Sequence, residues 1–347
     1  MTPAGSESPV TPVTPPPGPA TTQANSIALI LPLGSPDFIR AAEAVRDGFD
    51  AATRIKSDSP IPVRVYPVDN EGAALAAAYT EAISNGARCV VAGLTRDGAN
   101  TLATAESTVP TLVLNSVDRA GPLPPQIFSL NLSLEAEARQ VAHLAAGSGY
   151  RSVNVLSSGT MLARRVDEAF ELEWQNLGGR VVARFDIGRD HAQTANLKAA
   201  LQAQPADALF IAADSTTIKT IRPTLTMTLP TFTTSQVNDG KLGPGNIDLQ
   251  GIQFVDMPWM VQPDDPAVAL YPRPAKPLAA DLERFYALGI DAYRLAAGFA
   301  RTGGPGLDSV SGVTGKITLT DQHTFQRELT PVRFEEGQLV LINSLSR

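Results

Sequence analysis

One stretch near the start of the chain, residues 26–49, limits the choice of fold more than any other. It reads SIALILPLGSPDFIRAAEAVRDGF, and its apolar run at residues 27–31 has the length and composition of a strand buried on both faces. A turn follows, and apolar residues then recur at helical spacing to the end of the stretch. We expect Ser35 to cap this helix, with Pro36 at its first position and Asp37 in its first turn. The stretch therefore predicts the strand and helix that begin a βαβ unit.

The same order of strand, turn and helix repeats along the chain in two series. Strands are expected at 63–68, 88–93, 111–114 and 127–130 in the first series, and at 152–156, 181–185, 208–212 and 231–234 in the second. Short loops and amphipathic helices separate these strands, which is typical of a parallel, doubly wound sheet. The sequence therefore predicts an α/β fold with two Rossmann-like lobes.

The last hundred residues indicate how the lobes share the chain. A strand at 251–255 is followed by an irregular, proline-rich stretch and then by a strongly periodic helix from Leu282 to Phe299. Strands of alternating character follow at 316–320, 327–334 and 339–342. We expect this antiparallel tail to pack on the second lobe.

Three crossings of the chain between the lobes follow from this assignment. The expected division gives lobe one residues 26–130 and 256–308, and lobe two residues 131–255 and 309–347.

Residues 1–25 differ in composition from the rest of the chain. They are rich in Pro, Thr and Ser and nearly free of bulky side chains, so we expect a disordered tether. Two interpretations stay open. The tether follows a signal sequence that ends in a lipid-bearing cysteine, or it is an inert terminus.

Charge and composition exclude several classes of function. The net charge is −7 and no cluster of Lys and Arg occurs, so the chain is not expected to bind nucleic acid. No apolar run reaches the length of a membrane span. The single cysteine, Cys89, lies in an apolar run and is expected to be buried, which is compatible with either redox compartment.

Enzyme motifs are missing from the sequence. It contains no GxGxxG after a strand, no phosphate-binding loop, no HExxH, no GxSxG and no CxxC. We therefore expect no catalytic residue, no metal site and no cofactor.

Small polar turns follow many of the expected strands. In open α/β sheets, ligands bind at the carboxyl ends of the strands, which is where these turns lie. Backbone N–H groups at a helix start suit a small carboxylate, although each turn could equally be an ordinary helix cap. Arg96 is alternatively a solvated arginine, and Trp259 is alternatively a residue of the lobe-one core. The candidate cleft residues are Gly34, Ser35, Asp69, Asn70, Thr95, Arg96, Asn115, Ser116, Ser158, Thr160, Asp214, Ser215 and Trp259.

Four segments carry a resemblance to a known family. These are ALILPLGSPDFIRAAEAVRDGFDAA, DMPWM, RFYALGIDAYRLA and GVTGKITLTDQHTFQRELTPVRFEEGQLV. They resemble the carboxy-terminal domain of the LppC/LpoA-type lipoproteins over roughly residues 26–345. The resemblance implies a type I periplasmic binding protein fold with three hinge crossings. It also implies an outer-membrane lipoprotein in the periplasm that activates a class A penicillin-binding protein in peptidoglycan synthesis.

The family is not known for a catalytic residue, so the resemblance transfers none. This sequence departs from the family in two respects. Those activators carry a helical-repeat domain where this sequence has only the proline-rich tether, and the turn at residues 34–37 is less like the small polar loop that usually follows the first strand. Two functions are therefore carried forward. The first is a regulator that binds and activates a class A penicillin-binding protein, and the alternative is a periplasmic receptor for an amino acid or a similar small carboxylate.

Overall fold

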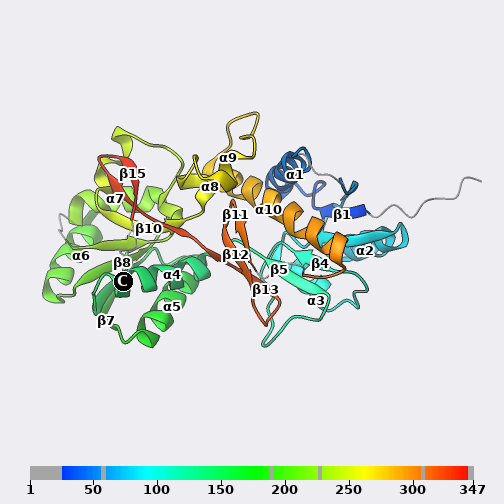
Figure 1. The fold of residues 1–347 in the computed structure, drawn as a ribbon. Helices are drawn as coiled ribbons and strands as arrows, with labels where there is room; N and C mark the ends of the chain where they lie inside the picture. The colour runs from blue at the N-terminus through cyan, green and yellow to red at the C-terminus, as the bar shows by residue number, and fades with distance from the viewer. Residues whose placement is uncertain (1–25, 56–59, 188–190, 226–228, 306–308, 343–347) are drawn as a thin grey trace, which may run out of the picture.

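A computed structural model describes residues 26–55, 60–187, 191–225, 229–305 and 309–342, so the expected tether at 1–25 lies outside the described residues. Two α/β lobes lie side by side (Figure 1). The sheet of lobe one contains β1 (Ser26–Leu31), β2 (Val63–Pro67), β3 (Ala87–Ala92), β4 (Thr111–Val113), β5 (Ile127–Leu130), β11 (Ser309–Gly312), β12 (Gly315–Leu319) and β13 (Thr324–Glu328). Its eight strands follow the order β11-β12-β13-β5-β4-β3-β1-β2, and the strands from β2 to β5 are parallel.

Lobe two is built in the same way around a seven-stranded sheet. Its strands are β6 (Ser152–Ser157), β7 (Arg180–Asp186), β8 (Ala208–Ala212), β9 (Thr231–Thr233), β10 (Ile252–Asp256), β14 (Thr330–Glu335) and β15 (Gln338–Leu341). The order is β15-β14-β10-β9-β8-β6-β7, with a parallel part from β7 to β10 and an antiparallel edge of β14 and β15. The prediction of two doubly wound lobes is confirmed.

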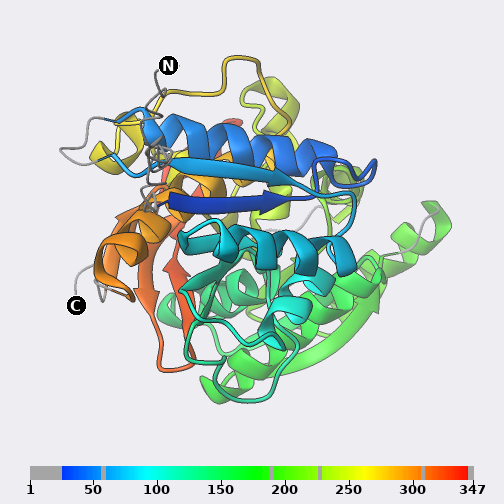
Figure 2. The same cartoon turned by 90° about the vertical axis from the view of Figure 1, so that its right-hand side faces the viewer.

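Helices cover both faces of each sheet. In lobe one, α1 (Ile39–Thr53) and α10 (Ala280–Thr302) lie on one face, and α2 (Ala73–Ser84) and α3 (Arg96–Ala103) lie on the other. Figure 2 looks at this lobe from its β2 edge and shows β1 and β2 between α1 and α2. In lobe two, α4 (Leu134–Gly147) and α5 (Met161–Asn176) face α6 (His191–Ala203) and α7 (Ser215–Leu225) across the sheet.

The first strand shows why its sequence is apolar throughout. Ile27, Leu29 and Leu31 join the core under α1 and α10, whereas Ala28 and Ile30 join the core under α2 and α3. All five side chains are fully buried. A strand in the middle of a doubly wound sheet therefore needs a continuous apolar run, because successive side chains point to opposite faces and both faces are covered.

The chain passes between the lobes three times, as predicted. The crossings follow β5, β10 and β13. After β10 the chain returns to lobe one through the short helices α8 (Pro258–Val261) and α9 (Pro266–Ala269), which precede α10.

The expected start of the first helix is wrong. α1 begins at Ile39, Phe38 stands at its N-cap without a side-chain bond, and the first turn holds no acidic residue. Ser35 instead accepts the N–H groups of Phe38 and Ile39 with its carbonyl, at 3.2 and 2.8 Å. Pro36 and Asp37 therefore belong to a separate turn before the helix. Ser35 does not cap the helix, because this turn intervenes.

The expected assignment of the tail is wrong in one part. The segment 327–334, expected as a single strand, is two strands that separate at Leu329 and belong to different sheets. Its first part, β13, pairs with β5 through Thr324 and Phe325, so residues 309–328 extend the sheet of lobe one and not that of lobe two. The alternating pattern runs through the break because Leu329 is itself buried, and a side-chain period of two does not reveal a change of sheet.

The long helices α1 and α10 approach each other so closely that their backbones touch. A Cβ atom on Gly48 of α1 would lie 1.9 Å from the carbonyl oxygen of Tyr286, and one on Gly289 of α10 would lie 2.1 Å from that of Val45. Two glycines on facing helical surfaces are therefore what allows this contact. The contact fixes α10 on lobe one.

We predict that Gly289→Ala destabilises the protein, because the added methyl group must push the two backbones apart. Overpacking of this kind costs roughly 1–3 kcal/mol, measurable by urea denaturation. The matched control is Gly298→Ala in the same helix, where an added Cβ has nothing within 4 Å. That variant should be as stable as the wild type or gain up to about 1 kcal/mol from the higher helix propensity of alanine. Equal effects of the two substitutions would contradict the close contact.

Candidate functional site

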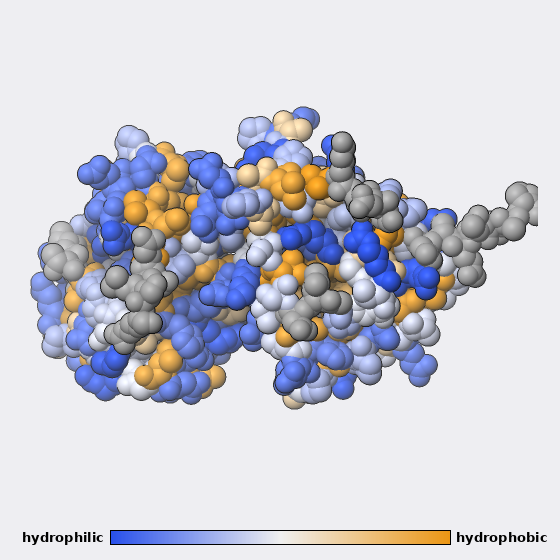
Figure 3. Space-filling view, in the orientation of Figure 1, coloured by the Kyte–Doolittle hydropathy of each residue, from blue (hydrophilic) through white to orange (hydrophobic). Residues whose placement is uncertain are grey.

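Two adjoining cavities lie where the lobes meet, and together they form what we call the interlobe crevice. They share Ser116, Asn131 and Ser133, and have volumes of about 300 and 730 Å³. The lining of the smaller cavity includes Leu162 and Arg165 of lobe two. Hydrophilic side chains gather at this junction on the face seen in Figure 3.

Three of the residues expected from the sequence line the smaller cavity, namely Arg96, Asn115 and Ser116. Arg96 is held by an ion pair, since its Nε donates to Asp118 Oδ1 at 2.8 Å. The side-chain amide of Asn115 donates to the carbonyl of Leu94 at 2.8 Å. Arg96 and Asn115 are therefore engaged with the chain itself, and their assignment as ligand contacts stays a prediction.

Four further candidates shape the loops after β1 and β2. A Cβ on Gly34 would lie 2.0 Å from Oδ1 of Asp69, so the glycine makes room for that carboxylate. Asn70 accepts the N–H of Gly72 at 3.1 Å, and Ser35 is buried. None of these four candidates lines either cavity of the crevice. These turn residues after β1 and β2 thus have structural roles within the two loops themselves.

The amide groups at the start of α3 are occupied by a residue that the sequence analysis missed. Glu71 is 5% exposed, and its carboxylate accepts the N–H of Leu94 at 2.9 Å and that of Thr95 at 2.5 Å. Thr95 also caps α3, because its hydroxyl accepts the N–H of Gly98 at 3.0 Å. Burial raises the pKa of Glu71, and the bonds from the backbone oppose that rise. The place at which a carboxylate ligand would bind the helix start is therefore filled by the chain's own carboxylate.

The neighbouring glycine supports this arrangement. A Cβ on Gly98 would lie 2.5 Å from Oε2 of Glu71, so the first turn of α3 leaves space for the carboxylate only because this position lacks a side chain. The sequence places Glu71 directly after Asp69 and Asn70, but this position does not indicate that its carboxylate is buried.

We predict that Glu71→Ala lowers the free energy of unfolding by about 2 kcal/mol or more, because buried N–H groups left without an acceptor cost roughly 1–3 kcal/mol. Chemical denaturation measures this. The control is Glu81→Ala on the exposed face of α2, which should change stability by less than about 0.5 kcal/mol. A loss no larger than that of the control would show that the carboxylate does not hold the loop.

Two of the four candidates of lobe two accept backbone N–H groups at helix starts. The hydroxyl of Thr160 accepts the N–H of Ala163 at 3.1 Å and caps α5. Asp214 accepts the N–H three residues further on at 2.7 Å, at the start of α7. Ser158 approaches the hydroxyl of Thr160 at 3.5 Å, and Ser215 is buried with no partner for its hydroxyl among the described residues. None of these residues lines the crevice.

Trp259 does not line either cavity of the crevice, which agrees with the alternative that the sequence left open, a residue of the core. Its side chain is fully buried in the core and lies 5.5 Å from the ring of Tyr286. The guanidinium of Arg273 stacks on it at 4.0 Å, and its backbone N–H donates to Val313 at 2.9 Å. The residue packs the first turn after the second crossing against α10, as its large apolar ring favours.

A buried ion pair joins the lobes beside the second crossing. Arg284 of α10 is 7% exposed, and its Nη2 lies 2.8 Å from Oδ2 of Asp256, the last residue of β10. The same nitrogen donates to the carbonyls of Ser235 and Asn238 in lobe two, at 3.0 and 3.1 Å. Asn238 in turn donates to Asp256 at 2.9 Å. The side chain of Arg284 on α10 of lobe one is thereby held by backbone carbonyls of lobe two.

Glu137 lies next to this pair and is fully enclosed. It lies in the first turn of α4, and its position there does not by itself indicate that the side chain is buried. Its carboxylate accepts the N–H of Ser235 at 3.1 Å. Burial and the nearby charge of Asp256 raise its pKa to about 7, although Arg327 and Arg284 oppose the rise.

This shift predicts how stability depends on pH. Unfolded, Glu137 releases its proton near its ordinary pKa of 4.5, whereas the folded protein retains it up to about pH 7. Stability should therefore fall as the pH rises from about 4.5 to about 7, with a share from Glu137 on the order of 3 kcal/mol at most. Glu137→Gln should remove that share in pH-resolved denaturation curves.

The matched control is Glu135→Gln in the same helical turn, where the side chain reaches solvent and pairs with Arg165. This variant should keep the pH dependence of the wild type. If Glu137→Gln kept it too, the buried carboxyl would not be the titrating group.

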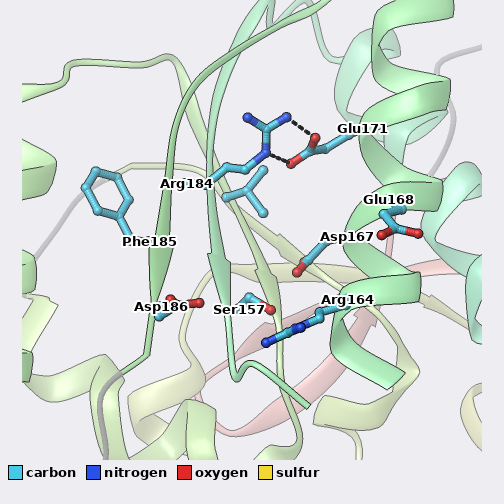
Figure 4. A pocket seen from close by; sticks show the side chains of 9 residues that line it. Ser157, Arg164, Asp167, Glu168, Glu171, Arg184, Phe185 and Asp186 are labelled. Carbon is cyan, nitrogen blue, oxygen red and sulfur yellow. Dashed lines mark hydrogen bonds and ion pairs between the residues drawn. The ribbon is translucent and has the colours of Figure 1, made fainter. Parts of the chain in front are cut away.

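An acidic pocket of about 270 Å³ lies on lobe two, away from the crevice, between α5 and the edge strand β7 (Figure 4). Glu171 pairs with Arg184 through two bonds, and Asp167 points toward Ser157. Burial raises the pKa of Asp167 to about 7, and the charges of neighbouring acids add to the rise. The hydrogen bond from Ser157 opposes it. Asp167 should thus add a second contribution to the pH dependence described above, over a similar pH range.

The fold and its three crossings define the class of protein. Two doubly wound lobes hinged in this way are the architecture of the type I periplasmic binding proteins, and solved structures of LpoA and of transporter-associated binding proteins share it. A family model described as LppC putative lipoprotein matches residues 20–337. The chain belongs to this family.

Relatives of known name support the assignment. "Penicillin-binding protein activator LpoA" of Yersinia pseudotuberculosis is 27% identical over 90% of this chain and 60% of its own length. The protein of the same name from Dickeya chrysanthemi is 28% identical over 81% of this chain and 47% of its own length. The chain thus spans about half the length of these relatives.

Two solved structures illustrate the similarity of fold. A putative branched-chain amino acid ABC transporter from Chromobacterium violaceum is 36% identical, with a TM-score of 0.77, over 89% of this chain and 99% of that one. The LpoA C-domain from Haemophilus influenzae, titled a regulator of PBP1A, is 23% identical with a TM-score of 0.74 over 91% of this chain and 99% of that one. Across the described ranges of this chain, no helix is both long and apolar enough to span a membrane.

Proposed function

We propose that this chain is a periplasmic regulator that binds a class A penicillin-binding protein and raises its peptidoglycan synthesis. The family and the activator names of its relatives support the proposal. In this proposal a lipid anchor upstream of residue 26 tethers the two-lobed domain to the outer membrane. The domain acts as a docking body and requires no catalytic residue of its own.

The observation that favours docking over solute capture is the carboxylate of Glu71. In a receptor for amino acids, free amide groups at a helix start serve the carboxylate of the ligand. Here Glu71 occupies the amides of Leu94 and Thr95, so an incoming ligand would have to displace a group that is covalently part of the chain. The buried pair of Arg284 and Asp256 adds to this by holding the lobes together without a ligand.

The second candidate is a receptor for an amino acid or a similar small carboxylate. It is favoured by the 36% identity to the Chromobacterium violaceum protein, whose title names a branched-chain amino acid transporter. The two-lobed fold is common to both candidates and does not separate them.

The experiment combines a synthesis assay with a ligand panel. We predict that the purified domain binds the periplasmic part of a class A penicillin-binding protein from the same organism and increases its rate of glycan polymerisation and cross-linking. A panel of amino acids should leave the melting temperature unchanged, although a true ligand at a hundred times its Kd would add about 2.7 kcal/mol.

A penicillin-binding protein of another class from the same organism serves as the control and should neither bind nor respond. Failure to bind the class A enzyme, together with a clear thermal shift by one amino acid, would overturn the proposal in favour of the receptor.

A further inference from the structure

The strand β15 forms an open edge of the lobe-two sheet, far from the crevice (Figure 1). Among the described strands it pairs with β14 alone, in an antiparallel register without a shift. The N–H of Ile342 points to β14 and donates to the carbonyl of Pro331 at 2.9 Å. Residues of an antiparallel strand alternate between its two sides, so Leu339 and Leu341 direct their N–H and C=O groups outward. The edge therefore presents the backbone groups of two residues to another strand.

The other three sheet edges among the described strands carry features that oppose such pairing. β7 exposes charged side chains, and its pairing with β6 shifts register. β2 exposes Arg64 and ends at Pro67, and in β11 the carbonyl of Ser311 accepts a bond from Arg294 at 2.8 Å. Charges, prolines and bulges are the usual protection of a sheet edge. The described residues 338–342 contain no charge, no proline and no shift of register, so the edge of β15 lacks this protection.

Exposed apolar side chains lie around this edge. Leu341 itself is 43% exposed. The loop that exposes Leu242 and Ile247, by 55 and 58%, lies against the turn before β15, because the N–H of Gly243 donates to the carbonyl of Gly337 at 2.9 Å. Apolar side chains gather over this part of lobe two, at the upper left of Figure 3. An apolar patch beside an open edge is typical of a surface that binds another protein chain.

The edge is complementary to itself. In an antiparallel pair with a two-fold axis at Val340, Leu339 of one copy lies opposite Leu341 of the other, and the reverse. Both residues direct their backbone groups outward, so each opposed pair exchanges both N–H···O bonds while the bonds to β14 stay intact. Both side chains point to the face on which Leu339 packs against the core of lobe two. Each copy would thus cover the exposed leucine of the other.

The charges near β15 are compatible with this arrangement. On β14, Glu335 pairs with Arg333 at 2.5 Å, and the exposed Glu336 lies in the turn before β15. A two-fold axis at the middle of β15 places the acidic turns of the two copies at opposite ends of the paired strands. The repulsion between two chains that each have a net charge of −7 is thereby kept away from the contact.

We propose that β15 pairs with β15 of a second copy of this chain and joins the two lobe-two sheets into one continuous sheet. Leu339 and Leu341 form the strand pairing, and Leu242 and Ile247 flank it. The contact comprises one short strand and a small patch, so the dimer is weak, with a Kd in the micromolar to sub-millimolar range. None of these four residues lines the crevice, which the dimer leaves free.

The first test measures the mass of the full chain against its concentration by sedimentation velocity. We expect a shift from monomer to dimer as the concentration approaches the millimolar range. Leu341→Lys places a charge among the leucines of the contact and should weaken dimerisation about tenfold or more. The matched control is Leu172→Lys, which makes the same change at a leucine of α5 that is 63% exposed, and it should dimerise like the wild type. A wild type that stays monomeric, or equal dimerisation of the two variants, would overturn the proposal.

The second test measures hydrogen exchange of single backbone amides by NMR and needs no substitution. The amides of Leu339 and Leu341 should exchange about tenfold more slowly in concentrated than in dilute samples. The amide of Ile342, which is bonded to β14, should exchange at the same rate in both. Protection of the outward amides by the periplasmic part of a synthase, but not by a second copy, would assign the edge to that partner and overturn the proposal. Dimerisation is measured without a synthase, so its outcome is independent of the proposed function.

Discussion

The buried contact of Arg284 with Asp256 and the carbonyls of Ser235 and Asn238 is the interaction on which the arrangement of the lobes depends. An isolated cation at this depth would be strongly unfavourable, and its partners come from the other lobe. The contact therefore specifies where α10, and with it lobe one, lies against lobe two. The touching backbones of α1 and α10 carry the same constraint into the core of lobe one.

Most of the fold could be predicted from the sequence because strands buried on both faces and capped helices leave strong local signals. The strands at 127–130 and 208–212 were predicted with the bounds observed. What failed depends on distant partners. The turn before α1 replaces the expected cap, and the alternation through Leu329 conceals a change from one sheet to the other. Local periodicity contains no information about which strand lies alongside.

The candidate site was less predictable for a related physical reason. Thr95 and Thr160 were recognised as polar residues at helix starts, and both cap helices. The residues that shape the electrostatics, Glu71, Glu137 and Arg327, are charged residues enclosed by segments remote in the sequence. A charged residue in a sequence is ordinarily read as solvated, so its burial becomes visible only when the tertiary contacts are known.

The third crossing places a mechanical limit on the whole molecule. β13 and β14 belong to different sheets but are separated by Leu329 alone, whose N–H is held by Gln140. Any rotation of one lobe against the other must be absorbed here by the two backbone torsions of one buried residue. Such a joint allows pivoting about a nearly fixed point and resists translation, so the distance between the two sheets at this joint stays constant while their angle changes.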